Sequence, residues 1–209
     1  MKGGKNMYLH LKHSTVKIED LGKVIYVDPY MIDKSYSDAD YIFITHSHYD
    51  HYSEDDIQKV MSENTTFIIT KDLVEKVEKF EKKYIIVQPN EKYNLDGISF
   101  ETIPAYNVNK VFHKKEYNWV GYIIKINEIR YYIAGDTDIT DEAKRVQTDI
   151  AFIPVGGTYT MNSKEAAELT NIIKPKIAIP IHYGVIVGTK DDAISFKNSL
   201  DIKVKCEII

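Results

Sequence analysis

One stretch, from Tyr41 to Asp56, restricts the fold of this chain more than any other. It reads YIFITHSHYDHYSEDD: an apolar, partly β-branched run, then four side chains that can bind metal within six positions. The apolar run is typical of a buried strand. Ser53 suits the N-cap of a helix, because three acidic residues follow it and a helix favours negative charge in its first turn. The sequence therefore predicts a strand, a loop rich in ligands and a helix.

The spacing within this loop suits two neighbouring cations. His46 and His48 are two positions apart, so both point to the same side of an extended chain. Asp50 and His51 fall where the chain turns into the helix, and they point elsewhere. Imidazole and carboxylate groups are typical ligands of zinc, iron and manganese. Because three of the seven His in the chain lie within six positions, a chance surface cluster is the weaker interpretation.

The pattern His-x-His-x-Asp-His after an apolar strand resembles the signature of the metallo-β-lactamase superfamily. The resemblance implies an α+β fold, a four-layer αββα sandwich of two mixed sheets with helices on the outer faces. It also implies a site for one or two metal ions at the edge of the sheets. Further ligands are expected after later strands, in a fixed order along the chain.

Two later residues lie where this family places ligands. Asp136 follows a predicted strand and a glycine, and it corresponds to the carboxylate that bridges both cations. His182 follows the buried strand predicted for Lys176 to Ile181, and it corresponds to the family's last His. The resemblance assigns His182 to the second cation, together with Asp50 and His51.

The third ligand of the first cation departs from the commonest pattern. His113 is the only His between the loop and His182. Many family members place this ligand earlier, about where Tyr106 or Asn107 stands. Either His113 reaches back to the cation, or the site is incomplete; we favour His113, because a cation held by two His needs a third partner. His13, near the N-terminus, is predicted to have a structural role.

Residues near other strand ends are expected to support the site or to contact a substrate. Asp28, at the end of a strand before Pro29, is expected to orient a ligand His or to contact loop amides. A plain strand-ending turn is the alternative. Lys110, beside a dication site, suits an anionic group of a substrate. The substrate-binding candidates are Tyr106, Asn107, Lys110, Thr158 and Tyr159.

Composition sets the remaining bounds. A length of 209 residues with 44% hydrophobic and 28% charged residues predicts one globular domain that spans residues 1–209. A net charge of −4 gives no strong attraction to nucleic acid. The single Cys206 fits a reducing compartment, and no apolar run reaches the length of a membrane span. We expect a cytoplasmic protein that binds a small-molecule substrate and no membrane, and a homo-oligomer remains an open alternative.

The whole set implies a metal-dependent hydrolase. Two divalent ions, with zinc as the first choice and manganese or iron as alternatives, lower the pKa of a shared water. The expected target is a small ester, lactone or phosphodiester, and Asp50 is expected to hold the water or to assist proton transfer. The motifs PAYN, AGDTD and PIHYG are similar to those of small prokaryotic hydrolases near the sugar-lactonase branch. The alternatives are an RNA-processing nuclease of the same fold and a non-catalytic or redox metal-binding module.

Overall fold

Two β-sheets face each other in the computed structural model, which describes residues 8–209. The first sheet follows chain order and mixes two strand directions: its first three strands are antiparallel and the rest are parallel. Its strands are β1 (Tyr8–Lys12), β2 (Thr15–Asp20), β3 (Lys23–Val27), β4 (Ala39–Phe43), β5 (Met61–Ile69) and β6 (Lys83–Ile86).

The second sheet is also mixed. Its antiparallel half runs from β7 to β10, and parallel pairing then joins β10 to β11, β12 and β13. Its strands are β7 (Lys92–Leu95), β8 (Ile98–Pro104), β9 (Val120–Ile126), β10 (Ile129–Ile133), β11 (Ile150–Pro154), β12 (Ile177–Ile181) and β13 (Lys205–Cys206).

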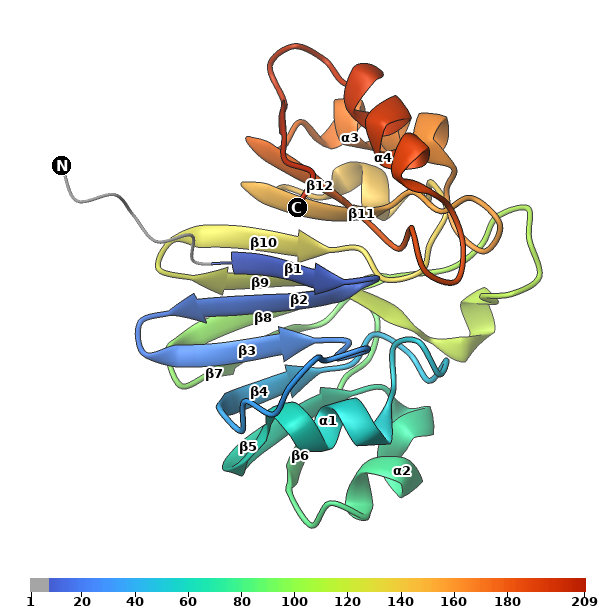
Figure 1. Cartoon of the computed structure of the whole chain (residues 1–209). Helices are drawn as coiled ribbons and strands as arrows, with labels where there is room; N and C mark the ends of the chain where they lie inside the picture. Colours follow the sequence, from blue (N-terminus) through green and yellow to red (C-terminus); the bar gives the residue numbers. More distant parts are fainter. Residues whose placement is uncertain (1–7) are drawn as a thin grey trace, which may run out of the picture.

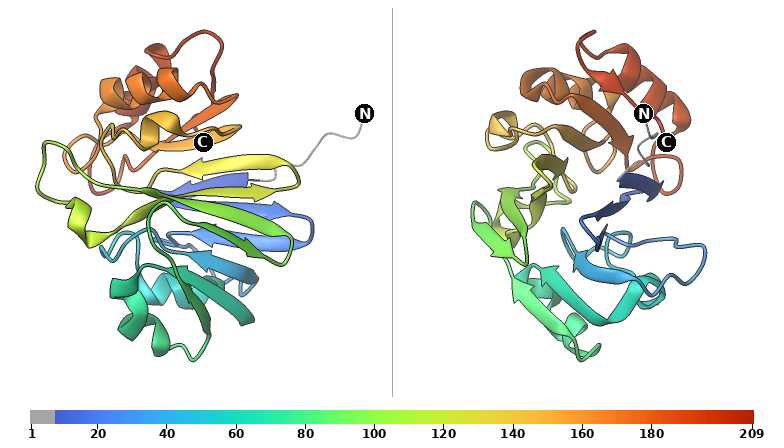
Figure 2. Two further views of the ribbon diagram at one scale, coloured as in Figure 1. Left: turned by 180° about the vertical axis from the view of Figure 1, so that it is seen from behind. Right: turned by 90° about the vertical axis from the view of Figure 1, so that its left-hand side faces the viewer.

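The core lies between the two sheets, which face each other in the right-hand view of Figure 2. In β8 the residues alternate between buried and half-buried, as expected for a strand with one face on the core. Phe43 of the first sheet packs edge-on against Phe100 and Tyr122 of the second, with ring centroids 5.0 and 5.1 Å away. Such aromatic contacts bury large apolar areas and fix the distance between the sheets.

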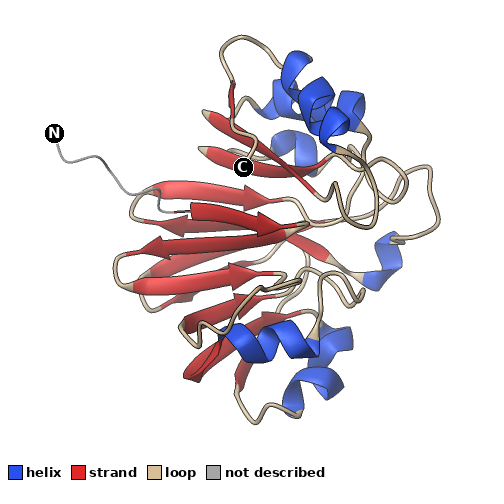
Figure 3. Cartoon of the chain, viewed as in Figure 1, coloured by secondary structure: helices blue, strands red, loops and turns tan. Residues whose placement is uncertain are grey.

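Helices cover the outer faces and complete four layers (Figures 1 and 3). α1 (Glu54–Val60) and α2 (Val74–Glu78) pack on the first sheet, while α3 (Ser163–Ile173) and α4 (Lys190–Asn198) pack on the second. The αββα sandwich predicted from the sequence is therefore confirmed. No helix within residues 8–209 is both long and apolar enough to cross a bilayer.

Two elements are shorter than the sequence predicts. Leu73, Val74, Val77 and Phe80 share one face at helical spacing and predict a helix from Lys71 to Lys82. The structure instead has a 3₁₀ turn, Lys71–Leu73, followed by the short α2. The predicted apolar positions Leu73 and Val77 are buried as expected, but the chain turns away at Glu81, whose φ is +52°. The sequence near the C-terminus also predicts a strand from Ile202 to Ile208. This strand pairs only at Lys205–Cys206, and Ile202 is fully exposed.

Candidate metal centre

The His-rich loop leaves β4 at its carboxyl end and turns sharply before α1. The backbone N–H groups of His51 and Tyr52 both donate to the carbonyl of His48, at 3.1 and 2.8 Å. The Ser53 hydroxyl then accepts from the N–H of Asp56 and caps α1, as the sequence predicts. His46 and His51 are both buried where this loop leaves the sheet.

The first group of ligand atoms comes from His46, His48 and His113, and all three atoms lie within 4.8 Å of one another. His113 reaches the group because its loop closes on itself: the N–H of Asn107 donates to the His113 carbonyl at 2.7 Å. The Oδ1 atom of Asn107 in turn accepts from the backbone N–H of His113, at 3.0 Å, and lies 3.1 Å from its Nδ1 atom. Asn107 is one of the two positions at which the family resemblance places this ligand, and here its side chain holds the later His in position.

The second group gathers around Asp50. Its Oδ2 atom lies 3.4 Å from Nε2 of His182 and 3.7 Å from Nε2 of His51. The carbonyl of His182 and its ring Nδ1 atom both lie close to Gly156, and a Cβ at this glycine would clash with the His182 carbonyl. This glycine therefore allows the close approach of two loops.

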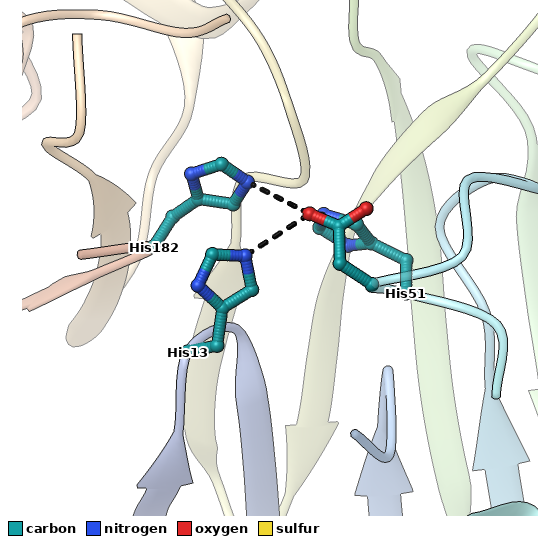
Figure 4. A group of neighbouring side chains, drawn as sticks. His13, His51 and His182 are labelled. Carbon is teal, nitrogen blue, oxygen red and sulfur yellow. Dashed lines mark hydrogen bonds and ion pairs between the residues drawn. The ribbon is translucent and has the colours of Figure 1, made fainter. Parts of the chain in front are cut away.

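His13 is a member of the second group that the sequence did not place there. Its Nε2 atom lies 3.0 Å from Oδ2 of Asp50. In Figure 4, His13 and His182 point to the same carboxylate oxygen from two different segments. The signal in the sequence was weak, because one His in a hairpin turn does not show which loop it will meet.

Asp136 joins the two groups. One oxygen, Oδ1, lies 3.2 Å from Nε2 of His51. The other, Oδ2, lies 3.2 Å from Nε2 of His113 and 3.2 Å from Nε2 of His182. Gly135, with φ of +66°, supplies the turn that aims this buried carboxylate inward after β10. Its contacts to both groups suit the bridging role that the sequence predicts.

Asp28 lies behind His51 and is fully buried. Its Oδ2 atom is 2.7 Å from Nδ1 of His51, and its two oxygens accept from the N–H and the hydroxyl of Thr45 at 2.8 and 2.7 Å. The carboxylate therefore orients a His and contacts a loop amide, the two roles considered for it from the sequence. A proton held on Nδ1 leaves the Nε2 atom of His51 free to face the centre.

Trp119 forms one wall of the first group. Its ring centroid lies 4.8 Å from the rings of both His46 and His48, and its Nε1–H donates to Asp72 at 2.9 Å. Only 8% of the residue is exposed, so the indole shields this side of the group from water. The sequence did not identify it, since an aromatic residue before a strand is an ordinary core position.

The unpaired polar atoms at the centre fit a metal site. Five buried ligand atoms have no hydrogen-bond partner among residues 8–209: Nε2 of His46, His51, His113 and His182, and Oδ1 of Asp136. A buried polar atom without a partner costs about 1–3 kcal/mol, so a convergent set of them indicates a ligand. Imidazole and carboxylate donors match zinc, manganese or iron.

Electrostatics favour a cation as well. Burial, together with the neighbouring His residues, lowers the pKa of His46 and His48, so both rings are neutral ligands at neutral pH. Burial alone would raise the pKa of Asp136, but His182 and His51 hold it well below its usual range. The carboxylates of Asp136 and Asp50 outweigh burial at His182 and raise its pKa to about 9. A cation that binds there must displace this proton.

The predicted substrate contacts divide into three kinds. Tyr159 lines a cavity of about 200 Å³ in front of the centre, with His48, Tyr49, Asp50, Phe112, His113, Asp136 and Ile186. Asn107 supports His113 and donates to the Tyr159 carbonyl. Tyr106, Lys110 and Thr158 do not line this cavity: Tyr106 donates to Glu142, Lys110 pairs with Asp138 at 2.6 Å, and Thr158 is exposed.

Comparison with known proteins identifies the family. Residues 9–182 match the family model described as the beta-lactamase superfamily domain. The chain belongs to the metallo-β-lactamase superfamily. Within it, the chain groups with metal-dependent hydrolases: a UPF0173 metal-dependent hydrolase from Nanoarchaeum equitans is 29% identical over 202 residues, which cover 93% of this chain and 91% of that protein.

Two solved structures share the fold. Igni18, a metallo hydrolase from Ignicoccus hospitalis, is 21% identical and superposes with a TM-score of 0.80 over 97% of this chain and 94% of that chain. CmlA, a diiron β-hydroxylase from Streptomyces venezuelae, is 13% identical and has a TM-score of 0.77 over 96% of this chain and 52% of that chain.

Proposed function

We propose that this metallo-β-lactamase relative uses two divalent cations to activate water against a small neutral ester or lactone. The observation that carries the proposal is the pair of ligand groups joined by Asp136, with the unpaired Nε2 atoms aimed between them. Zinc is the first choice, and manganese or iron suits the same ligands.

Each cation would have its own set of side chains. Asp136 would serve both, the first cation would take His46, His48 and His113, and the second would take Asp50, His51 and His182. When bound, such a pair of cations lowers the pKa of a shared water and polarises the bond under attack.

The residues of the chain prepare this site. Asp50 lines the cavity, and the hydrogen bond from His13, together with the neighbouring ring of His182, holds its pKa far below its usual range against the effect of burial. An ionised Asp50 is suited to accept a hydrogen bond from the attacking water or to take its proton. Asp28 fixes the ring of His51, and Trp119 excludes water from the first group.

The cavity favours a compact neutral substrate. Phe112 and Tyr159 pack edge-on with centroids 4.8 Å apart, and Ile186 completes an apolar wall. Among the described residues that line the cavity, none is Lys or Arg. Lys110, the cation expected to hold an anionic group, is neutralised by Asp138 at 2.6 Å. These features support an ester or lactone over a phosphodiester or an RNA chain, and a lactone agrees with the resemblance to the sugar-lactonase branch.

The test combines metal analysis with a substrate panel. The protein is purified without added metal, its metal content is measured, and the apoprotein is reloaded with Zn²⁺, Mn²⁺ or Fe²⁺. We expect about two ions per chain and turnover of aryl esters and γ-lactones that exceeds turnover of bis(p-nitrophenyl) phosphate and of single-stranded RNA. Asp136→Asn removes the bridge and should abolish turnover, while Asp141→Asn, a matched change at an exposed carboxylate, should not.

Two results would contradict the proposal. One is fewer than two ions per chain after reloading. The other is two bound ions without hydrolysis of any ester or lactone; turnover of RNA would then favour the nuclease. Oxygen consumption by the Fe²⁺-loaded protein would favour a redox role, which the diiron β-hydroxylase CmlA performs on the same fold.

A further inference from the structure

His13 lies in the turn between β1 and β2 and is 1% exposed. Its φ of +52° is in the left-handed region, where residues other than Gly are uncommon. The turn is held from both sides, because the His13 carbonyl accepts from the ring of His10, at 2.7 Å, and from the backbone N–H of His182, at 2.8 Å. The strained backbone is thus fixed by specific contacts, and it aims the ring at the metal centre.

The ring of His13 makes two contacts with the second ligand group. Nε2 lies 3.0 Å from Oδ2 of Asp50, and the ring centroid lies 4.1 Å from that of His182. These partners come from different sheets, since Asp50 follows β4 and His182 follows β12. His13 therefore connects the two sheets at the point where the second cation would bind (Figure 4).

The hydrogen bond to Asp50 defines the role of the ring. An ionised carboxylate can only accept, so Nε2 of His13 must carry the proton that it donates. The other nitrogen, Nδ1, is buried and has no hydrogen-bond partner within the described part of the chain, and it faces away from Asp50 on the same ring. This contact gives His13 the geometry of a hydrogen-bond donor to Asp50.

We propose that His13 is a positioning residue of the second metal group, which holds Asp50 through its ring and His182 through its carbonyl. The inference rests on the proposed two-cation site. Without the hydrogen bond, Asp50 is free to rotate about its side-chain bonds, and the second cation loses a fixed ligand. Partners of this kind contribute about 10- to 100-fold to metal affinity.

The experiment compares two amide variants of this residue. His13→Asn tolerates the left-handed backbone, but its side chain is too short to reach Asp50. His13→Gln is one methylene longer and can donate from its amide to the same oxygen. Ser14→Ala is the control in the same turn, because the Ser14 hydroxyl has no hydrogen-bond partner among residues 8–209. Each apoprotein is titrated with Co²⁺, and the two binding steps are followed by visible absorption and calorimetry, with circular dichroism to verify folding.

We expect His13→Asn to weaken the second Co²⁺ step by about 10- to 100-fold and to leave the first step unchanged. His13→Gln should recover most of this loss, and Ser14→Ala should match the wild type. An unchanged second Co²⁺ affinity in His13→Asn would overturn the proposal. A second Co²⁺ affinity in His13→Gln as low as that in His13→Asn would also overturn it and would indicate that His13 is itself a ligand. A wild-type protein that binds fewer than two ions would instead contradict the proposed function, so the two failures are distinguishable.

Discussion

Asn107 and His113 are held together through one side-chain oxygen, since Oδ1 of Asn107 contacts both the backbone N–H and the Nδ1 atom of His113, at 3.0 and 3.1 Å. This pair explains how a His that comes late in its loop reaches the first ligand group. The sequence left open whether His113 is the third ligand of the first cation, and this contact allows a direct test by substitution of Asn107.

Asn107→Leu should weaken the first metal site. The change removes the acceptor that fixes the tautomer and orientation of His113, and partners of this kind contribute about 10- to 100-fold to affinity. Metal content after dialysis and a Co²⁺ titration measure the effect. Asn107→Asp keeps an acceptor at this position and should retain more of the affinity. Equal affinities in the Leu variant and the wild type would show that His113 does not need this support.

Asp28→Asn should weaken the second site by a different route. Asn has only one acceptor oxygen, so it cannot accept both from the backbone N–H of Thr45 and from Nδ1 of His51, and the partner that directs the His51 Nε2 atom toward the centre is weakened. We expect a loss of about 10- to 100-fold in the second Co²⁺ step. Asp20→Asn is the matched control, because Asp20 accepts from the neighbouring N–H of Leu21 in an exposed turn. If both variants bind the second Co²⁺ with wild-type affinity, Asp28 does not support His51 as a ligand.

The sequence predicted the parts of the site that depend on local order. His46, His48, Asp50 and His51 follow one strand, and their spacing alone indicates which pairs point together. The structure places all seven predicted ligand residues at one edge of the sandwich, because each of them follows a strand end there. The local pattern and the family's order of ligands were sufficient for this prediction.

The contacts that the sequence could not predict are those made between distant loops. His13 is 37 residues from Asp50 and meets it only once the hairpin turn and the loop after β4 pack together. The pairing of Lys110 with Asp138, 28 residues away, similarly decides that this cation does not face the cavity. Neither contact has a signature in residue type or spacing, because each depends on the path of an irregular loop.

Asp56 should make stability depend on pH at the acidic end. Burial alone would raise its pKa, but hydrogen bonds from Lys59, Ser53 and the backbone amides of Met31 and Ile32 lower it below its usual value. A carboxyl whose pKa is lower in the folded state stabilises the fold above the unfolded pKa, near 3.9, and this contribution is lost as the pH falls through the folded pKa.

Asp56→Asn should therefore lower the free energy of unfolding by about 1–3 kcal/mol at pH 7, and the difference from the wild type should shrink below about pH 4. Urea unfolding of both apoproteins at pH values about one unit apart, from pH 3 to pH 7, measures this difference in the free energy of unfolding. Asp55→Asn, an exposed neighbour in the same first turn, is the control for the charge alone. A difference in the free energy of unfolding between Asp56→Asn and the wild type that stays constant with pH would mean that the lost contacts do not involve the ionised carboxylate.

Trp119 should report directly on the first metal. It is the only Trp in the chain, so the whole indole emission comes from a ring 4.8 Å from both His46 and His48. A paramagnetic ion such as Co²⁺ in the first group should quench this emission strongly, whereas Zn²⁺, which is d¹⁰ and redox-inactive, should change it much less. In His48→Ala, quenching should require a higher Co²⁺ concentration. His182→Ala alters a ligand assigned to the second cation, so the first quenching step should persist in this variant. The contradicting outcome is unchanged emission in the wild type when metal analysis shows that Co²⁺ is bound. The ion would then lie away from His46 and His48, and these two residues would no longer be assigned to a common cation.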